Sequence, residues 1–123
     1  MNHLARTFLI LAVVAIVLFA AGCPERRSIS DIQANPGRYT SKDVSIVGIV
    51  KDSYGVSVPG TPIRGGIYKV DDGTGSIWVA TENSVPAKGT EIGLTGTVGS
   101  GVSWSGKNYG LGIYEKDRRF GKR

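Results

Sequence analysis

Histidine and cysteine are almost absent from this chain of 123 residues, which contains one of each. His3 and Cys23 lie in or just after an apolar N-terminal segment, so the remainder has no imidazole and no thiol. These groups are the usual ligands of zinc and haem and frequent catalytic bases and nucleophiles. A single cysteine also excludes a disulfide within the chain. We therefore expect no metal, no cofactor and no enzymatic activity.

Loops that cradle phosphate or calcium are also missing, although the chain has 18 glycines. No glycine motif follows a strand pattern and opens a helix pattern, as a phosphate-binding loop requires. The segment DDGTGS at residues 71–76 lacks the ligand spacing of a calcium loop. Its neighbouring carboxylates, Asp71 and Asp72, would point to opposite faces of a strand, which is poor geometry for a catalytic pair. These glycines are better explained as turn residues.

Charge is missing from a long N-terminal stretch. No charged residue occurs from Thr7 to Pro24, and the segment from Leu9 to Ala20 is continuously apolar. Arg6 and the amino terminus precede it with positive charge, as in a secretory signal peptide. At about 1.5 Å per residue the stretch is nearly long enough to cross a bilayer, so an uncleaved anchor helix is the alternative. Either interpretation ties the rest of the chain to a membrane.

The end of this stretch, LFAAGC at residues 18–23, resembles the lipobox of secreted lipoproteins. In that family a signal peptidase cuts before the cysteine, after its thiol has received a diacylglycerol. Ala20 stands where the family usually has leucine. The resemblance implies that residues 1–22 are a cleaved signal peptide and that Cys23 carries lipid. Two or three acyl chains would hold the protein on a bilayer far better than one. We therefore expect a lipid-anchored domain at the cell envelope, on the extracytoplasmic side of a membrane.

The residues beyond the expected cleavage site suffice for one small domain. We assign residues 23–28 to a polar tether, residues 29–117 to the folded domain and residues 118–123 to a solvated basic tail. The whole chain carries a net charge of +5 at pH 7, and this modest positive charge suits anionic lipid headgroups, nucleic acid or neither. We expect a monomer.

A short helical turn is expected before the first strand. In SISDIQANPGRY, residues 28–39, Ser30 and Gln33 have the spacing of a capping box. Pro36 and Gly37 should end the turn quickly, because the residue before a proline avoids the helical region. After this point β-branched residues alternate between glycine-containing turns, which predicts an all-β fold.

Two segments repeat one strand pattern. VSIVGIV at Val44–Val50 and IGLTGTV at Ile92–Val98 both have apolar residues at their first, third and seventh positions and glycine at the fifth. In a strand these positions share one face. Gly48 and Gly96 are then expected at sharp bends or bulges, which favour a closed barrel over the alternative of two sandwich strands.

Between these segments, YKVDDGTGSIWVA at residues 68–80 predicts a hairpin with its turn at Asp72–Gly75. The alternation of a strand separates two sets of side chains. The inward set is expected to be Tyr68, Val70, Ile77 and Val79. The outward set is expected to be Ile67, Lys69, Ser76, Trp78 and Ala80. A last strand is expected at Tyr109–Glu115, which makes five strands.

The order of these elements resembles the OB-fold, particularly its anticodon-binding-like nucleic-acid-binding branch and the small lipoproteins that carry it. The resemblance covers roughly residues 32–116. In that branch strands two and three meet at an Asp-x-Thr-Gly turn, matched here by Asp72, Thr74 and Gly75. The helix often found between strands three and four is replaced by ENSVPAKG, residues 82–89. The resemblance implies a five-stranded OB-fold barrel with a short N-terminal helical turn.

The resemblance also implies a binding surface on strands two and three, flanked by the loops between strands one and two and between strands four and five. The candidate ligand-binding residues there are Tyr54, Arg64, Lys69, Trp78, Trp104 and Lys107. Aromatic side chains interleaved with cations suit base stacking and phosphate contacts. The alternative for Trp78 is a structural one, packing under a long loop or against the helical turn.

Three hypotheses for function remain open at this point. The first is a lipid-anchored, non-catalytic binding module that recognises a polymer or partner protein of the envelope. The second is a nucleic-acid-binding OB-fold protein for single-stranded DNA or RNA. The third is a structural envelope protein that uses the barrel only as a spacer. We rank the envelope partner first, because nucleic acid is scarce where a lipid anchor would place the domain.

Overall fold

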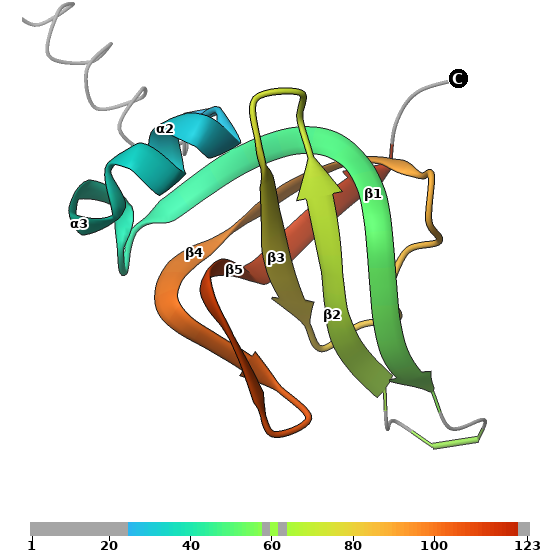
Figure 1. Cartoon of the computed structure of the whole chain (residues 1–123). Helices are drawn as coiled ribbons and strands as arrows, with labels where there is room; N and C mark the ends of the chain where they lie inside the picture. The colour runs from blue at the N-terminus through green and yellow to red at the C-terminus, as the bar shows by residue number, and fades with distance from the viewer. Residues whose placement is uncertain (1–24, 58–59, 62–63, 121–123) are drawn as a thin grey trace, which may run out of the picture.

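The computed structural model describes residues 25–57, 60–61 and 64–120 (Figure 1). The expected signal peptide, the lipidation site Cys23 and residues 121–123 of the expected tail therefore lie outside the described residues. In these residues, two short helices precede five strands. The elements are α2 (Ile29–Ala34), α3 (Pro36–Tyr39), β1 (Asp43–Ser57), β2 (Arg64–Asp71), β3 (Ser76–Thr81), β4 (Glu91–Trp104) and β5 (Lys107–Phe120). Within the described residues no helix is long and apolar enough to span a membrane.

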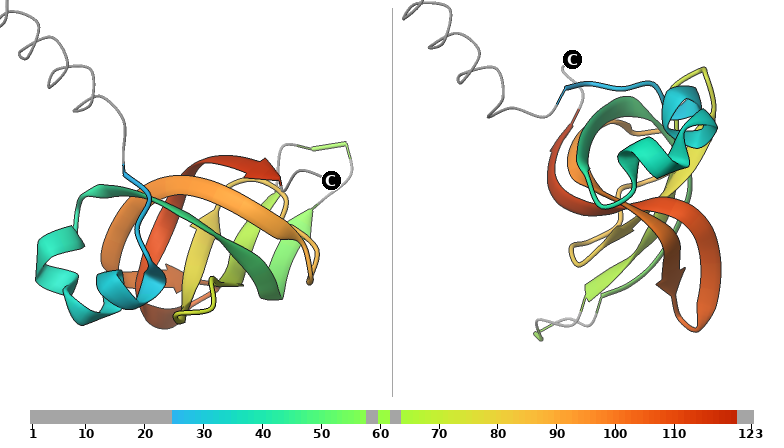
Figure 2. Two further views of the ribbon diagram at one scale, coloured as in Figure 1. Left: turned by 90° about the horizontal axis from the view of Figure 1, so that it is seen from above. Right: turned by 90° about the vertical axis from the view of Figure 1, so that its left-hand side faces the viewer.

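The five strands close into one barrel in the order β1-β2-β3-β5-β4. Neighbouring strands run antiparallel except β3 and β5, which are parallel over three residue pairs from Trp78 and Gly112 to Ala80 and Tyr114. The strongly curved β1, β4 and β5 wrap around the core while α2 and α3 lie at one end (Figures 1 and 2). The predicted five-stranded barrel is confirmed, and the two-sheet sandwich is excluded.

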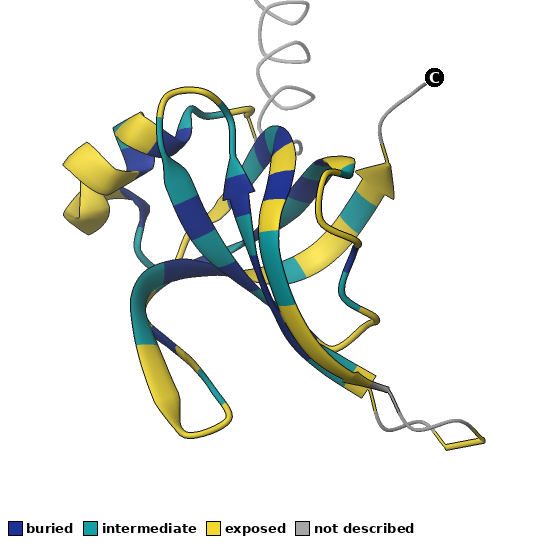
Figure 3. Cartoon of the chain, turned by 45° about the vertical axis from the view of Figure 1, so that its right-hand side comes forward, coloured by how far each residue is buried: buried dark blue, intermediate teal, exposed yellow. Residues whose placement is uncertain are grey.

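One face of each strand forms the core, as the alternating sequence predicts. Both repeated segments place their first, third and seventh residues inside the barrel, and the blue bands of Figure 3 show this alternation. The buried residues of these two segments are Val44, Ile46, Val50, Ile92, Leu94 and Val98. The hairpin adds Tyr68, Val70, Ile77 and Val79, as expected, and α2 adds Ile29 and Ile32.

Glycine in the two repeated strands permits neighbouring strands to cross closely. A Cβ atom on Gly48 would lie 2.5 Å from the Asp71 carbonyl oxygen and 2.8 Å from a methyl group of Val70. A Cβ on Gly96 would meet the Tyr114 carbonyl in the same way, beside a register shift between β4 and β5. The two glycines therefore remove side chains where β1 crosses β2 and where β4 crosses β5.

The N-terminal cap of α2 differs from the predicted one. Ser28, not Ser30, is the N-cap, and its Oγ accepts a hydrogen bond of 3.2 Å from the Asp31 N–H. The Ser30 N–H instead donates to Thr74 Oγ1 in the β2–β3 turn, and the Gln33 side-chain amide donates to the Ser76 carbonyl. Tertiary acceptors thus replace the local capping box. Pro36 does end α2, but it also begins α3, in which proline occupies the first turn.

The turn between β2 and β3 joins the barrel to α2. One Asp72 carboxylate oxygen accepts the Ile29 N–H at 2.8 Å, and the other accepts the Thr74 N–H and hydroxyl at 2.9 and 2.6 Å. Partial burial would raise the pKa of Asp72. The hydrogen bonds from Thr74, Ile29 and Gly75 outweigh this effect and hold that pKa below its ordinary value.

The described parts of the expected tether and tail, residues 25–28 and 118–120, both pair with the barrel, which corrects the predicted limits of the domain. The Ser45 N–H donates to the Glu25 carbonyl, and the Arg27 N–H donates to the Ser45 carbonyl at 2.8 Å. At the other end, β5 continues to Phe120, which pairs with Ile92 of β4. Both segments are held by strands that lie far away in the sequence. Their own residues show no strong strand pattern, so sequence reasoning did not include them in the domain.

Glu115 forms a buried polar cluster across β2, β3 and β5. Its carboxylate accepts hydrogen bonds from the Tyr68 hydroxyl, the Thr81 hydroxyl and the Arg118 guanidinium. The Glu115 side chain is 1% exposed and that of Arg118 is 15% exposed. Burial, together with the hydrogen bond to Glu115, raises the pKa of Tyr68. Because Arg118 belongs to this cluster, it is not part of a solvated tail.

The close approach at Gly48 can be tested by adding one methyl group. Gly48→Ala should lower the free energy of unfolding by roughly 1–3 kcal/mol, because a rigid backbone carbonyl blocks the new Cβ. Gly93→Ala is the matched control, since its Cβ would make an ordinary contact of 3.5 Å with Val47. Urea unfolding of residues 25–123 compares the two, and equal midpoints would contradict the close crossing.

The Asp72 turn should make stability depend on pH. Because folding lowers the pKa of Asp72, its stabilising effect is present above about pH 4, the ordinary aspartate value, and is lost as the pH falls through the lowered pKa. Asp72→Asn should therefore destabilise the domain at neutral pH and much less in acid. Urea midpoints at both pH values measure this, with the exposed Asp117→Asn as control. If Asp72→Asn lowers stability equally at both pH values, the charge of the Asp72 carboxylate is not the cause.

Candidate binding surface

Three aromatic side chains from three strands meet on the outside of the barrel. Tyr54 comes from β1, Trp78 from β3 and Tyr109 from β5. The ring centroids of Tyr54 and Trp78 are 6.1 Å apart, and those of Trp78 and Tyr109 are 4.8 Å apart. Both pairs are tilted, a favourable arrangement for aromatic contacts. Trp104 at the end of β4 borders the same hollow, which has a volume of about 390 Å³. We call this surface the aromatic face.

Two lysines lie against these rings. The Lys69 Nζ is 5.3 Å from the centroid of the Trp78 ring, and the Lys107 Nζ is 5.1 Å from that of Tyr109. Cations at this distance are attracted to the negative face of an aromatic ring. Lys69 is the cross-strand partner of Trp78, so the sheet register itself fixes the first pair. The aromatic face therefore combines flat apolar surfaces with positive charge.

The β4–β5 hairpin gives the aromatic face its shape. Gly110 has φ +78°, a conformation that favours glycine, and it follows Tyr109 directly. Gly112 pairs with Trp78, and a Cβ there would lie 2.7 Å from the Trp78 carbonyl oxygen and 2.9 Å from a Val102 methyl group. The two glycines let β5 turn and approach β3 closely. Tyr109 thereby reaches the ring of Trp78.

The structure brings together most of the candidate residues from the sequence. Five of them belong to the aromatic face as defined by the hollow and the ring contacts: Tyr54, Lys69, Trp78, Trp104 and Lys107. Arg64 does not line the hollow; it is exposed at the start of β2, where it pairs with Ser57 of β1. Trp78 is half-buried and lies outside the core cluster, so it faces outward as predicted.

Sequence reasoning missed Tyr109 and did not predict the burial of Ile67. Tyr109 was expected only as the first residue of the last strand, although Lys107 two positions earlier already belonged to the candidate site. Ile67 was expected on the outward side of β2, and it is fully buried there. Its cross-strand partner is Tyr54, and it does not belong to the barrel core cluster. The outward side of β2 is therefore covered at this point, which simple alternation does not predict.

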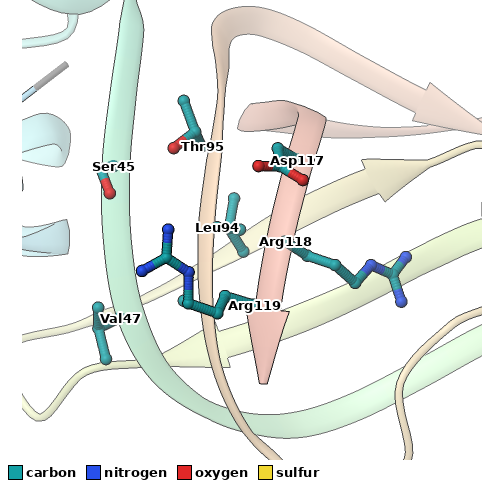
Figure 4. Close-up of a pocket in the computed structure, with 8 residues that line it drawn as sticks. Ser45, Val47, Leu94, Thr95, Asp117, Arg118 and Arg119 are labelled. Atoms are coloured by element: carbon teal, nitrogen blue, oxygen red, sulfur yellow. The ribbon is translucent and has the colours of Figure 1, made fainter. Parts of the chain in front are cut away.

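A second hollow crosses the outer surfaces of β1, β4 and β5 (Figure 4). It has a volume of about 190 Å³, and its lining includes Ser45, Thr95, Asp117 and Arg119 but no aromatic residue. Figure 4 shows the Arg118 and Arg119 side chains pointing to opposite sides of β5, with that of Arg119 on the side of Ser45 and Val47. Within the described residues, no group of three or more metal-ligating side chains is suited to hold a metal ion.

Comparisons with known proteins identify the fold but no family. No protein family model and no curated protein matches the chain. Among solved structures, an aspartyl-tRNA synthetase from Leishmania major Friedlin matches with a TM-score of 0.53 and 11% identity, over 89% of this chain and 26% of that chain. The chain thus spans about a quarter of that synthetase. Together with the strand order, this match shows that the chain has an OB-fold.

Two smaller proteins also match, each with a TM-score of 0.48. The second OB-fold domain of replication protein A from Methanococcus maripaludis is 21% identical over 68% of this chain and 88% of that chain. An OBody bound to hen egg-white lysozyme is 15% identical over 68% of this chain and 84% of that chain.

Proposed function

We propose that this protein is a non-catalytic OB-fold binding module, held at a membrane by lipid on Cys23, which binds a polymer or partner protein of the cell envelope through its aromatic face. The observation that carries the proposal is the meeting of Tyr54, Trp78 and Tyr109 beside two lysines. This surface lies where OB-folds commonly bind their ligands, on the barrel side between two projecting strand connections.

The arrangement suits a ligand with flat faces and negative charge. Tyr54 is 52% exposed, so its ring can receive a ligand without any rearrangement of the core. Lys69 and Lys107 already lie beside the rings, so one ligand can stack on an aromatic side chain and reach an ammonium group at the same time. An acidic envelope polymer or an acidic segment of a protein has this combination of properties.

The membrane location rests on the sequence. The uncharged stretch from Thr7 to Pro24 and the AAGC ending at Cys23 support export followed by lipidation. Such an anchor would hold the binding module on the extracytoplasmic side as a monomer. The described domain offers no thiol and no histidine, which supports a binding role rather than a catalytic one.

Single-stranded nucleic acid is a second candidate, favoured by the same combination of rings and cations. Grooves that bind single strands without sequence preference stack bases on aromatic side chains, at about 1–3 kcal/mol per base, and contact phosphates through lysine and arginine. The aromatic face supplies both kinds of contact. We rank this candidate second because of the proposed location. A domain anchored on the extracytoplasmic side would meet only nucleic acid that lies outside the cell membrane.

Photo-crosslinking from the aromatic face tests the first candidate. A photoreactive phenylalanine analogue at Tyr54 should crosslink to envelope material in intact cells of the native host. The same analogue at Phe120 is the control, because that side chain is also exposed, at 54%, but lies at the end of β5. Trp78→Ala should reduce the Tyr54 crosslink while leaving the free energy of unfolding within about 2 kcal/mol of the wild-type value. Equal crosslinking from both positions would contradict the proposed site.

Titration with an oligothymidine separates the second candidate from the first. Nucleic acid on the aromatic face should quench tryptophan fluorescence, and its affinity should fall with salt at a log–log slope of about −0.7 per phosphate neutralised. Attraction by basic groups elsewhere would give the salt dependence without quenching. Quenching abolished by Tyr109→Ala would favour nucleic acid, and no binding at low salt would reject it. If Trp78→Ala unfolds the domain, then Trp78 is a structural residue and the proposed site is wrong.

A further inference from the structure

Glu25, the first residue that the structure describes, lies two positions after the expected lipidation site. Glu25 is already attached to the barrel, because its carbonyl accepts the Ser45 N–H at 3.3 Å, and Arg26 forms a parallel bridge with Ser45. Only Pro24 separates Glu25 from Cys23. Each residue spans at most about 3.6 Å, so the Cα atom of Glu25 can lie no more than about 7 Å from that of Cys23. A lipid on Cys23 would therefore hold Glu25 close to the membrane. A barrel held so closely cannot rotate freely above a membrane.

Basic side chains surround the point at which the chain joins the barrel. Arg26 lies beside β1, and Arg27, Arg38 and Lys42 border a hollow of about 420 Å³ that Glu25 and Asp43 also line. We call Arg26, Arg27, Arg38 and Lys42 the basic face. Arg26, Arg38 and Lys42 are exposed, and none of the three forms an ion pair within the described part of the chain.

The two carboxylates that line this hollow are already paired. Glu25 lies 2.7 Å from the Arg27 guanidinium, and Asp43 lies 2.9 Å from the Lys116 ammonium group. Hydrogen bonds from Lys116 and Thr97 hold the pKa of Asp43 below its ordinary value, so this carboxylate stays charged and paired. The unpaired charge of the basic face is therefore positive.

The basic face and the aromatic face lie toward opposite ends of the molecule. Residues 25–28, drawn in blue, run along the upper side in Figure 2 (right), whereas the β4–β5 hairpin projects from the lower side. Figure 1 shows the same separation, with α2 above and the hairpin below. The hairpin carries Trp104 and Lys107. A barrel that rests on its basic face therefore presents its aromatic face away from the resting surface.

We propose that the basic face docks on the anionic headgroups of the same membrane that holds the lipid anchor, so that the aromatic face points away from the bilayer. This inference rests on the proposed anchor at Cys23, which brings the two surfaces together. Guanidinium groups match phosphate geometry, and each lysine or arginine near an anionic surface strengthens binding roughly fivefold. The lipid determines that the domain is bound, and the basic face determines how it is oriented.

Hydrogen exchange on the full-length protein in vesicles tests the docking. The protein is reconstituted into phosphatidylcholine alone and into phosphatidylcholine mixed with phosphatidylglycerol. Amides of residues 38–44 should exchange more slowly in the anionic vesicles, whereas those of the β4–β5 hairpin should not change. Arg38→Ser with Lys42→Ser should weaken docking by about fivefold per cation and remove most of this protection. Lys51→Ser with Lys88→Ser removes the same charge outside the basic face and should retain it.

Equal exchange in the two kinds of vesicle would overturn the docking, as would loss of protection in the control variant. Protection of the hairpin instead of residues 38–44 would also overturn it, because the domain would then lie the other way round. The intact mass of the same membrane-extracted sample tests the anchor separately. A lipid-free Cys23 would reject the anchor, whereas a lipidated Cys23 without protection would leave the anchor intact and reject only the docking.

Discussion

The buried carboxylate of Glu115 holds together the junction on which closure of the barrel depends. β3 and β5 are paired over only three residue pairs, from Trp78 to Ala80 on β3. Glu115 extends this short junction, because it binds Thr81 at the end of β3, Tyr68 of β2 and Arg118 further along β5. A carboxylate that is 1% exposed is tolerated only where its charge is paired and hydrogen-bonded. Opening of the junction would take the Thr81 and Tyr68 hydroxyls away from this charge and leave it only Arg118 of its own strand, so the cluster opposes opening.

The aromatic face is built across the same junction. Trp78 lies on β3 and Tyr109 on β5, and their rings touch only because the two strands are held side by side around Gly112. The core and the candidate site therefore both depend on the β3–β5 pairing that closes the barrel. Apolar side chains pack inside the barrel there, and the aromatic face lies outside it. At the other end of the molecule, residues 25–28 and the Asp72 turn attach the N-terminal segment rigidly to the barrel. With the proposed lipid anchor at Cys23, this rigid attachment would give the aromatic face a defined direction relative to the membrane.

Local patterns in the sequence were sufficient for the core and insufficient for long-range pairing. The alternation in Val44–Val50 and Ile92–Val98 predicted the inward rows, and Asp72–Gly75 predicted the turn, because both depend on neighbouring residues. The cap at Ser28 and the contact of Tyr109 with Trp78 could not be found in this way. The first depends on competition from Thr74, and the second on a parallel pairing and a positive φ at Gly110. Even so, five of the six candidate residues that the OB-fold resemblance implied lie together on the aromatic face, because the strand order that carries the resemblance also brings β1, β3 and the β4–β5 hairpin together.

The most direct test of this account is the nuclear Overhauser effect between the ring protons of Trp78 and Tyr109 in a Glu115→Gln variant. Glutamine keeps the size of the side chain but removes the charge, so it leaves the Arg118 guanidinium half-buried without its partner. The account predicts a loss of roughly 3–5 kcal/mol in the free energy of unfolding, and weaker ring-to-ring effects as the β3–β5 junction opens. Ring-to-ring effects of wild-type strength in a variant of unchanged stability would show that the barrel and its aromatic face close without the Glu115 cluster.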